Sequence, residues 1–240
     1  MTVDFAAREH VQKLRRAGLR PSEALIHTIT RSGAAAFAPL LELATNFELF
    51  DGEEPEIFAP IHALRLLGEL PQLAMIEPLL RKYPVATYGE WDELPRLWAT
   101  ETPQIIGRLG AAAHPALWAI VDSAEWEPTA RTMATIALSN TTAVAPELRQ
   151  PLIEAYRERM RGSEDMVVRT NAVVGLTGLG SSEDYQEIMA LYRGSTVNKG
   201  VVAASTARQL LLGGGEKTIA CTTHTLAERY EQHGPNESAE

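Results

Sequence analysis

The sequence has one cysteine and no long apolar run. Its single thiol, Cys221, cannot form a disulfide within the chain, which is typical of proteins from a reducing compartment. No apolar run reaches the ~18 residues that a membrane-spanning helix needs. Asp4, Arg8 and Glu9 lie within the first ten residues, so no secretory signal peptide is expected. We therefore expect a cytoplasmic protein with no membrane partner and no disulfide framework.

Positive charge is also scarce. The chain has 22 Lys and Arg residues against 31 Asp and Glu residues, a formal net charge of -9 at pH 7. An acidic protein repels phosphate backbones unless its basic residues cluster. The two densest basic groups lie in 13–20 and 157–161, and both are interpreted as solvated helix faces. The composition therefore predicts no nucleic-acid partner.

Alternating strand patterns are nearly absent, and aromatic residues make up only 6% of the chain. Apolar residues recur at helical spacing instead, as in Val168, Ala172, Leu176 and Leu179. Glycine and proline interrupt this pattern often, which predicts short helices. The expected helices are 3–17, 22–32, 34–47, 56–69, 72–82, 91–100, 102–109, 113–123, 127–139, 146–161, 164–178, 182–193, 198–212 and 217–232.

The helices are expected to form one domain over residues 1–233. Residues 1–54 read as a divergent N-terminal cap, and 217–233 as a C-terminal capping helix. The polar end of the chain, 234–240, is expected to be disordered.

A weak internal repeat runs through the helical pattern. Ala63 and Ala172 are 109 residues apart, and Ala134 and Ala172 are 38 apart, each with leucines at matching positions. Both offsets fit a unit of roughly 36–38 residues with two helices. The small residues are expected where helices cross closely, because stacked pairs bury a continuous core.

The best-defined unit runs Asp165-Met-Val-Val-Arg169-Thr-Asn-Ala172-Val-Val-Gly-Leu-Thr-Gly-Leu179-Gly180. It resembles the first helix of a HEAT repeat, which carries an acid, a Val-Arg pair, a spaced Ala and a Leu-Gly ending. The resemblance is closest to bacterial HEAT-like repeats of the phycobilisome-lyase type and extends over about 55–212. It implies an all-α fold, a right-handed α-α superhelix built as a solenoid of antiparallel helix pairs.

Two acidic turns, each with a tryptophan, are the candidate partner-binding site. Their tryptophans are 35 residues apart, and equivalent turns of a solenoid line up along one edge. An aromatic anchor rimmed by charge is typical of protein–protein hot spots. The alternative is structural, since acids at helix N-termini stabilise the helix dipole. The residues are Glu90, Trp91, Asp92, Glu93, Glu125, Trp126 and Glu127.

An enzyme is the alternative class. Trp118 and Asp122 lie four apart on one expected helix, with Trp98 upstream, and this pairing is similar to that of HEAT-like alkylpurine DNA glycosylases. The chain departs from those proteins because it is acidic and because no arginine is expected on a facing helix. Arg131 and Arg169 are interpreted as repeat-ladder arginines instead. The lyase-type resemblance would imply bilin attachment to another protein, but no residue marks that activity.

The remaining reactive residues form no recognisable site. The six histidines are scattered, and Cys221 with His224 lacks a third group to orient it. The glycines at 213–215 follow no strand and are interpreted as a hinge. We therefore predict no catalytic, cofactor-binding or metal residues. The expected function is a non-enzymatic protein–protein interaction or scaffolding module, whose partner is a protein with a basic or amphipathic helix.

Overall fold

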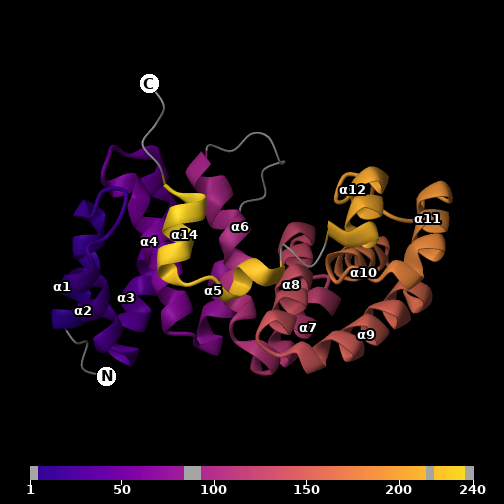
Figure 1. The fold of residues 1–240 in the computed structure, drawn as a ribbon, viewed down its shortest axis with the longest axis horizontal. Coiled ribbons are helices and arrows are strands. Elements are labelled where there is room, and N and C mark those ends of the chain that lie inside the picture. The colour runs from indigo at the N-terminus through magenta and orange to yellow at the C-terminus, as the bar shows by residue number, and fades with distance from the viewer. Residues whose placement is uncertain (1–4, 84–92, 215–218, 236–240) are drawn as a thin grey trace. The chain divides into compact units, whose positions relative to one another are not determined.

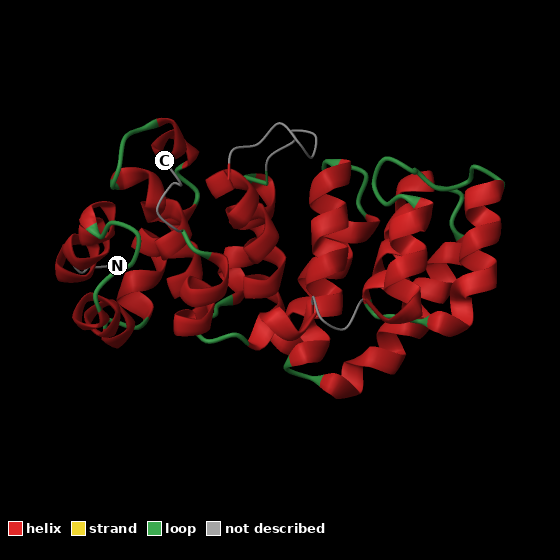
Figure 2. Ribbon diagram, turned by 45° about the horizontal axis from the view of Figure 1, so that its top comes forward, coloured by secondary structure: helices red, strands yellow, loops and turns green. Residues whose placement is uncertain are grey.

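The structure is a computed structural model that describes residues 5–83, 93–214 and 219–235. Within these ranges every regular element is helical, which confirms the all-α class (Figures 1 and 2). None of the described helices is long and apolar enough to cross a membrane. The chain forms two compact units. Unit 1 comprises Met1–Ile105 and His224–Glu240, and unit 2 comprises Ile106–Thr223.

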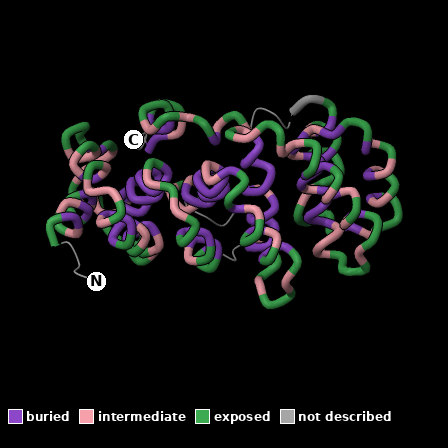
Figure 3. The backbone as a smooth tube through the Cα atoms, turned by 90° about the horizontal axis from the view of Figure 1, so that it is seen from below, coloured by how far each residue is buried: buried purple, intermediate pink, exposed green. Residues whose placement is uncertain are grey.

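Unit 1 is built around α4, whose residues from Ala59 to Gly68 are all buried (Figure 3). Pro60 lies in its first turn, where a missing N–H costs nothing. Helices α3 and α4 pack against each other, and α1 packs against α3. The α-helices of this unit are α1 (Phe5–Gln12), α2 (Glu23–Arg31), α3 (Ala34–Ala44), α4 (Ala59–Glu69), α5 (Ile76–Arg81), α6 (Glu93–Gly107, which continues into unit 2) and α14 (Leu226–His233). Its 3-10 turns are η1 (Lys13–Arg16), η2 (Phe47–Asp51), η3 (Glu56–Phe58) and η4 (Leu73–Met75).

Unit 2 is built around α8 and α10, which pack on each other and are buried over most of their length. Helix α7 packs against α8, and α9 packs against α10. Asp165 begins α10 by accepting a hydrogen bond from the Val167 amide at 2.7 Å. The α-helices are α7 (His114–Asp122), α8 (Pro128–Asn140), α9 (Arg149–Gly162), α10 (Met166–Gly178), α11 (Tyr185–Arg193) and α12 (Ala204–Gln209). The shorter turns are η5 (Gly110–Ala113), η6 (Thr141–Ala143), η7 (Pro146–Leu148), η8 (Ser182–Asp184), η10 (Cys221–Thr223) and a π-helical turn, η9 (Leu210–Gly214).

The two helices expected at 91–100 and 102–109 are one helix, so that prediction was wrong. Helix α6 continues through Pro103. A proline inside a helix leaves the carbonyl four residues earlier without its usual donor, and here that carbonyl belongs to Ala99. The Tyr83 hydroxyl donates to the Ala99 oxygen at 3.3 Å and supplies the missing hydrogen bond.

The C-terminal boundaries also differ from the expectation. The helix expected at 198–212 is shorter, because α12 spans only Ala204–Gln209 before the π-helical turn. The helix expected at 217–232 is interrupted: Ile219 and Ala220 are helical, Cys221–Thr223 form η10, and α14 begins at Leu226, where Thr225 forms a capping box with Glu228. Residues 215–218 lie outside the described ranges.

The expected disordered tail was wrong at its start. Gly234 and Pro235 are buried, and the Gly234 carbonyl accepts a hydrogen bond from Arg65. Residues 236–240 lie outside the described ranges.

The three expected close-packing alanines, Ala63, Ala134 and Ala172, are all buried. The tightest approach in α10 is nevertheless at Gly175. A Cβ atom there would lie 2.4 Å from Cε2 of Tyr156, on α9. The ring cannot retreat easily, because Tyr156 is fully buried and its hydroxyl donates to the Thr135 carbonyl at 3.0 Å. The contact between α9 and α10 therefore requires glycine at this position.

We expect Gly175→Ala to lower the free energy of unfolding of the protein by about 1–3 kcal/mol, because the added methyl overpacks the Tyr156 ring. The matched control is Gly178→Ala on the same helix, where the nearest atom lies 3.9 Å away. That change should be neutral or slightly stabilising, since alanine favours the helix. Urea unfolding measures both variants, and equal stabilities would contradict the packing argument.

Candidate functional site

The acidic turns predicted as a partner site are described only in part. Residues 90–92 lie outside the described ranges, and Glu93 is the first residue of α6 in unit 1. Residues 125–127 form the turn before α8 in unit 2, where Ser123 Oγ accepts from the Glu125 amide at 3.2 Å. Trp126 is half-buried in this turn. The alignment of the two turns stays a prediction.

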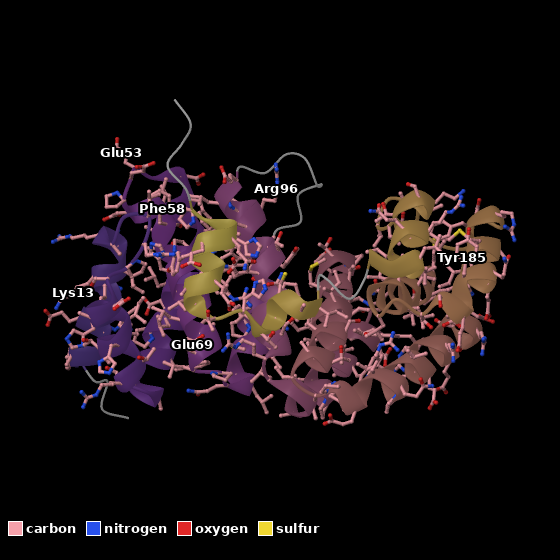
Figure 4. All side chains as sticks on the ribbon, viewed as in Figure 1. Lys13, Glu53, Phe58, Glu69, Arg96 and Tyr185 are labelled. Atoms are coloured by element: carbon pink, nitrogen blue, oxygen red, sulfur yellow. The ribbon has the colours of Figure 1, made fainter. Side chains whose placement is uncertain are left out.

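A groove in unit 1 that the sequence did not indicate lies where α2, the end of α4 and the start of α14 meet. Its volume is about 490 Å³. Half-buried apolar side chains from all three helices line it, as do two exposed carboxylates. The lining residues are Glu23, Ile26, His27, Thr30, Glu69 (labelled in Figure 4), Leu70, Thr225, Leu226 and Ala227.

The groove lies in the more acidic part of the chain. Unit 1 holds 11 basic and 19 acidic residues, a formal net charge of -8, whereas unit 2 holds 11 basic and 12 acidic residues, a formal net charge of -1. Glu23 and Glu69 add two carboxylates directly at the apolar lining made by Ile26, Leu70 and Leu226. A site of this kind attracts a ligand that combines positive charge with an apolar surface.

A buried ion pair joins two helices of unit 1, α4 and α6. Arg65 on α4 forms a bidentate pair with Glu101 on α6, with Nε–Oε2 and Nη2–Oε1 distances of 2.9 and 2.6 Å. The two side chains are 0% and 2% exposed. Arg229 on α14 donates to Gln104 at 2.9 Å and lies 3.7 Å from Glu101. Helices α4, α6 and α14 thus share one buried carboxylate.

Tyr230, the next residue on α14, contacts α4 through His62. The His62 Nε2–H donates to the Gly18 carbonyl at 2.8 Å, because a carbonyl can only accept. Its Nδ1 therefore accepts from the Tyr230 hydroxyl at 2.7 Å. The Arg65 guanidinium lies 4.4 Å from the centroid of the Tyr230 ring, a cation–π contact. Burial lowers the pKa of His62 to about 4 and raises that of Tyr230.

Unit 2 holds a second candidate site between α7 and α9. Arg159 on α9 donates to both Asp122 oxygens, at 3.0 and 2.7 Å, and its guanidinium carbon lies 3.8 Å from the Trp118 ring centroid. Tyr156 packs against the same indole edge-on, with centroids 5.4 Å apart. The carboxylate and guanidinium are 45% and 24% exposed, so a ligand can reach the pair.

Two sequence interpretations are wrong here. Arg159 is the arginine on a facing helix that the sequence was expected to lack. The basic run 157–161 is also not a plain solvated face, because Arg157 pairs with Asp184 at 2.8 Å and Arg161 with Glu187 at 2.7 Å.

The other residues of the glycosylase comparison lie elsewhere. Trp98 is buried and donates to the Ala44 carbonyl at 2.8 Å, so its ring is no platform for a ligand. Arg131 donates to the Val121 carbonyl at 2.9 Å and to Asp165 at 3.1 Å. Arg169 donates to the Ser163 carbonyl.

We expect His62 to make the protein less stable as the pH falls from 6.5 towards 4. In this window the unfolded chain binds a proton at His62 while the folded chain does not, so stability rises with pH by up to about 1.4 kcal/mol per pH unit. The measurement is urea unfolding at several pH values. His62→Gln should flatten the slope, and the exposed control His27→Gln should keep it. Parallel slopes in all three proteins would contradict the assignment.

Comparison of the chain with family models, curated proteins and solved structures gave no match. The HEAT-repeat resemblance therefore stays a prediction based on the motif at 165–180. The structure offers two candidate sites, the groove of unit 1 and the Trp118–Asp122–Arg159 cluster of unit 2.

Proposed function

We propose that the chain is a non-enzymatic protein-interaction module of the cytoplasm, and that the groove of unit 1 binds a basic amphipathic helix of a partner protein. The observation that carries this proposal is that the apolar side chains of Ile26, Leu70 and Leu226 line the groove together with the carboxylates of Glu23 and Glu69. We propose that the chain as a whole is a solenoid of antiparallel helix pairs, a right-handed α-α superhelix of the HEAT kind.

The chemistry of the groove matches one recurring mode of recognition. A helix bound in a groove presents apolar side chains at i, i+3, i+4 and i+7, and its flanks can carry lysine or arginine. A volume of about 490 Å³ accommodates a few such side chains. Glu23 and Glu69 would meet the basic flanks, and the net charge of unit 1 would speed association.

The ionisable groups support a binding role rather than catalysis. The described side chains with the largest pKa shifts are His62, Tyr156 and Tyr230, and burial is the main cause for each. All three are engaged in hydrogen bonds inside the protein, and none lines the groove. An active site would instead place perturbed groups where a substrate reaches them.

The test uses a labelled 18-residue peptide designed as a helix, with leucines on one face and lysines on both flanks. We expect it to bind the wild-type protein, and Glu23→Lys/Glu69→Lys to weaken binding about tenfold in fluorescence anisotropy. The control is Glu125→Lys/Glu127→Lys, the same charge change in the acidic turn before α8. A peptide of equal composition without an apolar face should bind neither protein tightly. If only the control variant lost affinity, the acidic turn would be the site and the groove proposal would be wrong.

A second candidate function is recognition of a damaged DNA base, and it is favoured by the position of Arg159 over Trp118 and beside Asp122. An aromatic face, a cation and a carboxylate together can hold an electron-poor base next to a phosphate. The resemblance to alkylpurine DNA glycosylases supports the same chemistry. The formal net charge of -1 in unit 2 removes the main electrostatic objection to a nucleic acid there.

In a gel-shift assay at low salt, we expect the full chain to retard a DNA duplex with one methylated purine more than the undamaged duplex. Trp118→Ala should remove this preference, whereas Trp126→Ala, the control, should keep it. If chromatography detects release of the methylated base from the duplex, unit 2 has glycosylase activity. No difference between the two duplexes would eliminate this candidate.

A further inference from the structure

We propose that α14 is an internal ligand, and that the surface it covers on α4 and α6 is a receptor for a partner helix that presents an arginine followed directly by a tyrosine. The proposal goes beyond the groove function, because the receptor lies beneath α14 rather than beside it. It rests on how α14 is held.

Helix α14 is held mainly by polar anchors. Of its eight residues, Arg229 and Tyr230 are the buried ones. Arg229 donates to Gln104, and Tyr230 donates to His62. Buried hydrogen bonds of this kind fix a docking geometry, and their net contribution to stability is modest because folding exchanges them for hydrogen bonds to water. The proposal therefore requires that α14, with two buried residues, opens more readily than α4, which is buried from Ala59 to Gly68.

Two parts of the receptor surface are held by contacts outside α14, although Arg65 Nη1 also donates to the Gly234 carbonyl just after that helix. Arg65 and Glu101 join α4 to α6 through a bidentate pair that involves no residue of α14. His62 is already oriented by the Gly18 carbonyl, and its Nδ1 faces the incoming hydroxyl. An acceptor for a guanidinium and an acceptor for a phenol are therefore held on neighbouring helices, ready for an occupant.

The occupant follows from the residues that fill the surface now. Arginine and tyrosine, like tryptophan, are enriched among the hot spots of protein interfaces. The ring of Tyr230 also lies 4.4 Å from Arg65 and 5.4 Å from Arg20, so an aromatic side chain suits this position between two cations. A partner helix with the same Arg–Tyr pair would make the same contacts.

Displacement of α14 from this surface would also remove one wall of the groove. Thr225, Leu226 and Ala227 at the start of α14 form one of its walls. A partner that displaces α14 therefore removes the binding site proposed above, so the two occupants exclude each other. Binding of a partner helix to the receptor surface would in this way regulate binding in the groove.

The test uses the full chain with Arg229→Glu, which places a carboxylate beside Glu101 and Gln104. Hydrogen exchange of the amides in 226–233 should accelerate at least about tenfold, while exchange in α4 stays as in the wild type. The control Gln232→Glu, on the exposed face of α14, should leave exchange unchanged.

The second measurement asks whether the exposed surface binds in trans. A fluorescein-labelled peptide of residues 222–235 should bind Arg229→Glu about tenfold more tightly than the wild type, whose surface is occupied. The same peptide with Arg229→Glu and Tyr230→Ala should not bind, and Gln104→Ala in the protein should weaken binding.

Three results would overturn the proposal. Unchanged exchange in Arg229→Glu would mean that the polar anchors do not hold α14. Accelerated exchange in α4 as well would mean that α14 is part of the core of unit 1. Accelerated exchange of α14 alone without peptide binding would mean that no receptor surface lies beneath it. The groove peptide is a different probe, so each of these outcomes leaves the groove test independent.

Discussion

The buried pair of Arg65 and Glu101 is the interaction on which unit 1 depends. It fastens α4 to α6, and the second oxygen of the same carboxylate lies 3.7 Å from Arg229 on α14. Two guanidinium groups around one carboxylate leave an excess of positive charge inside the unit, which burial penalises. The Gly234 carbonyl accepts from Arg65 and the Gln104 side chain accepts from Arg229, which offsets part of this penalty. The position of α14, and with it one wall of the groove, follows from where these acceptors lie.

The local sequence pattern was sufficient to predict most of the helices and their buried faces. Ala63, Ala134 and Ala172 are buried because the apolar stripe of a helix follows from its period, whichever neighbours cover it. The continuation of α6 through Pro103 was not predictable in this way. It depends on a hydroxyl 16 residues away along the chain, and local propensity carries no information about Tyr83. The same holds for the groove, whose walls from α2 and α14 are about 200 residues apart in sequence.

The spacing of the arginines in the basic run on α9 predicts which of them point in the same direction. Successive residues of a helix turn by about 100°, so Arg157 and Arg161 lie about 40° apart while Arg159 points away from both. The structure follows this geometry, because Arg157 and Arg161 pair with acids at 184 and 187, whereas Arg159 turns to Asp122 on α7. Helical phase thus predicts two sets of partners. What it cannot supply is the identity of the facing helix, which tertiary packing decides.

The uneven division of charge between the two units favours different ligands at the two candidate sites. A formal net charge of -9 for the whole chain argues against nucleic acid only if the acids are spread evenly, and they are not. Nearly all of the excess belongs to unit 1, where it reinforces the carboxylates at the groove and favours a cationic helix. Unit 2 is close to neutral, and its cluster already pairs one carboxylate with one guanidinium. A ligand there gains little from long-range attraction, so its affinity has to come from contact with the indole face and from hydrogen bonds that compete with the Arg159–Asp122 pair.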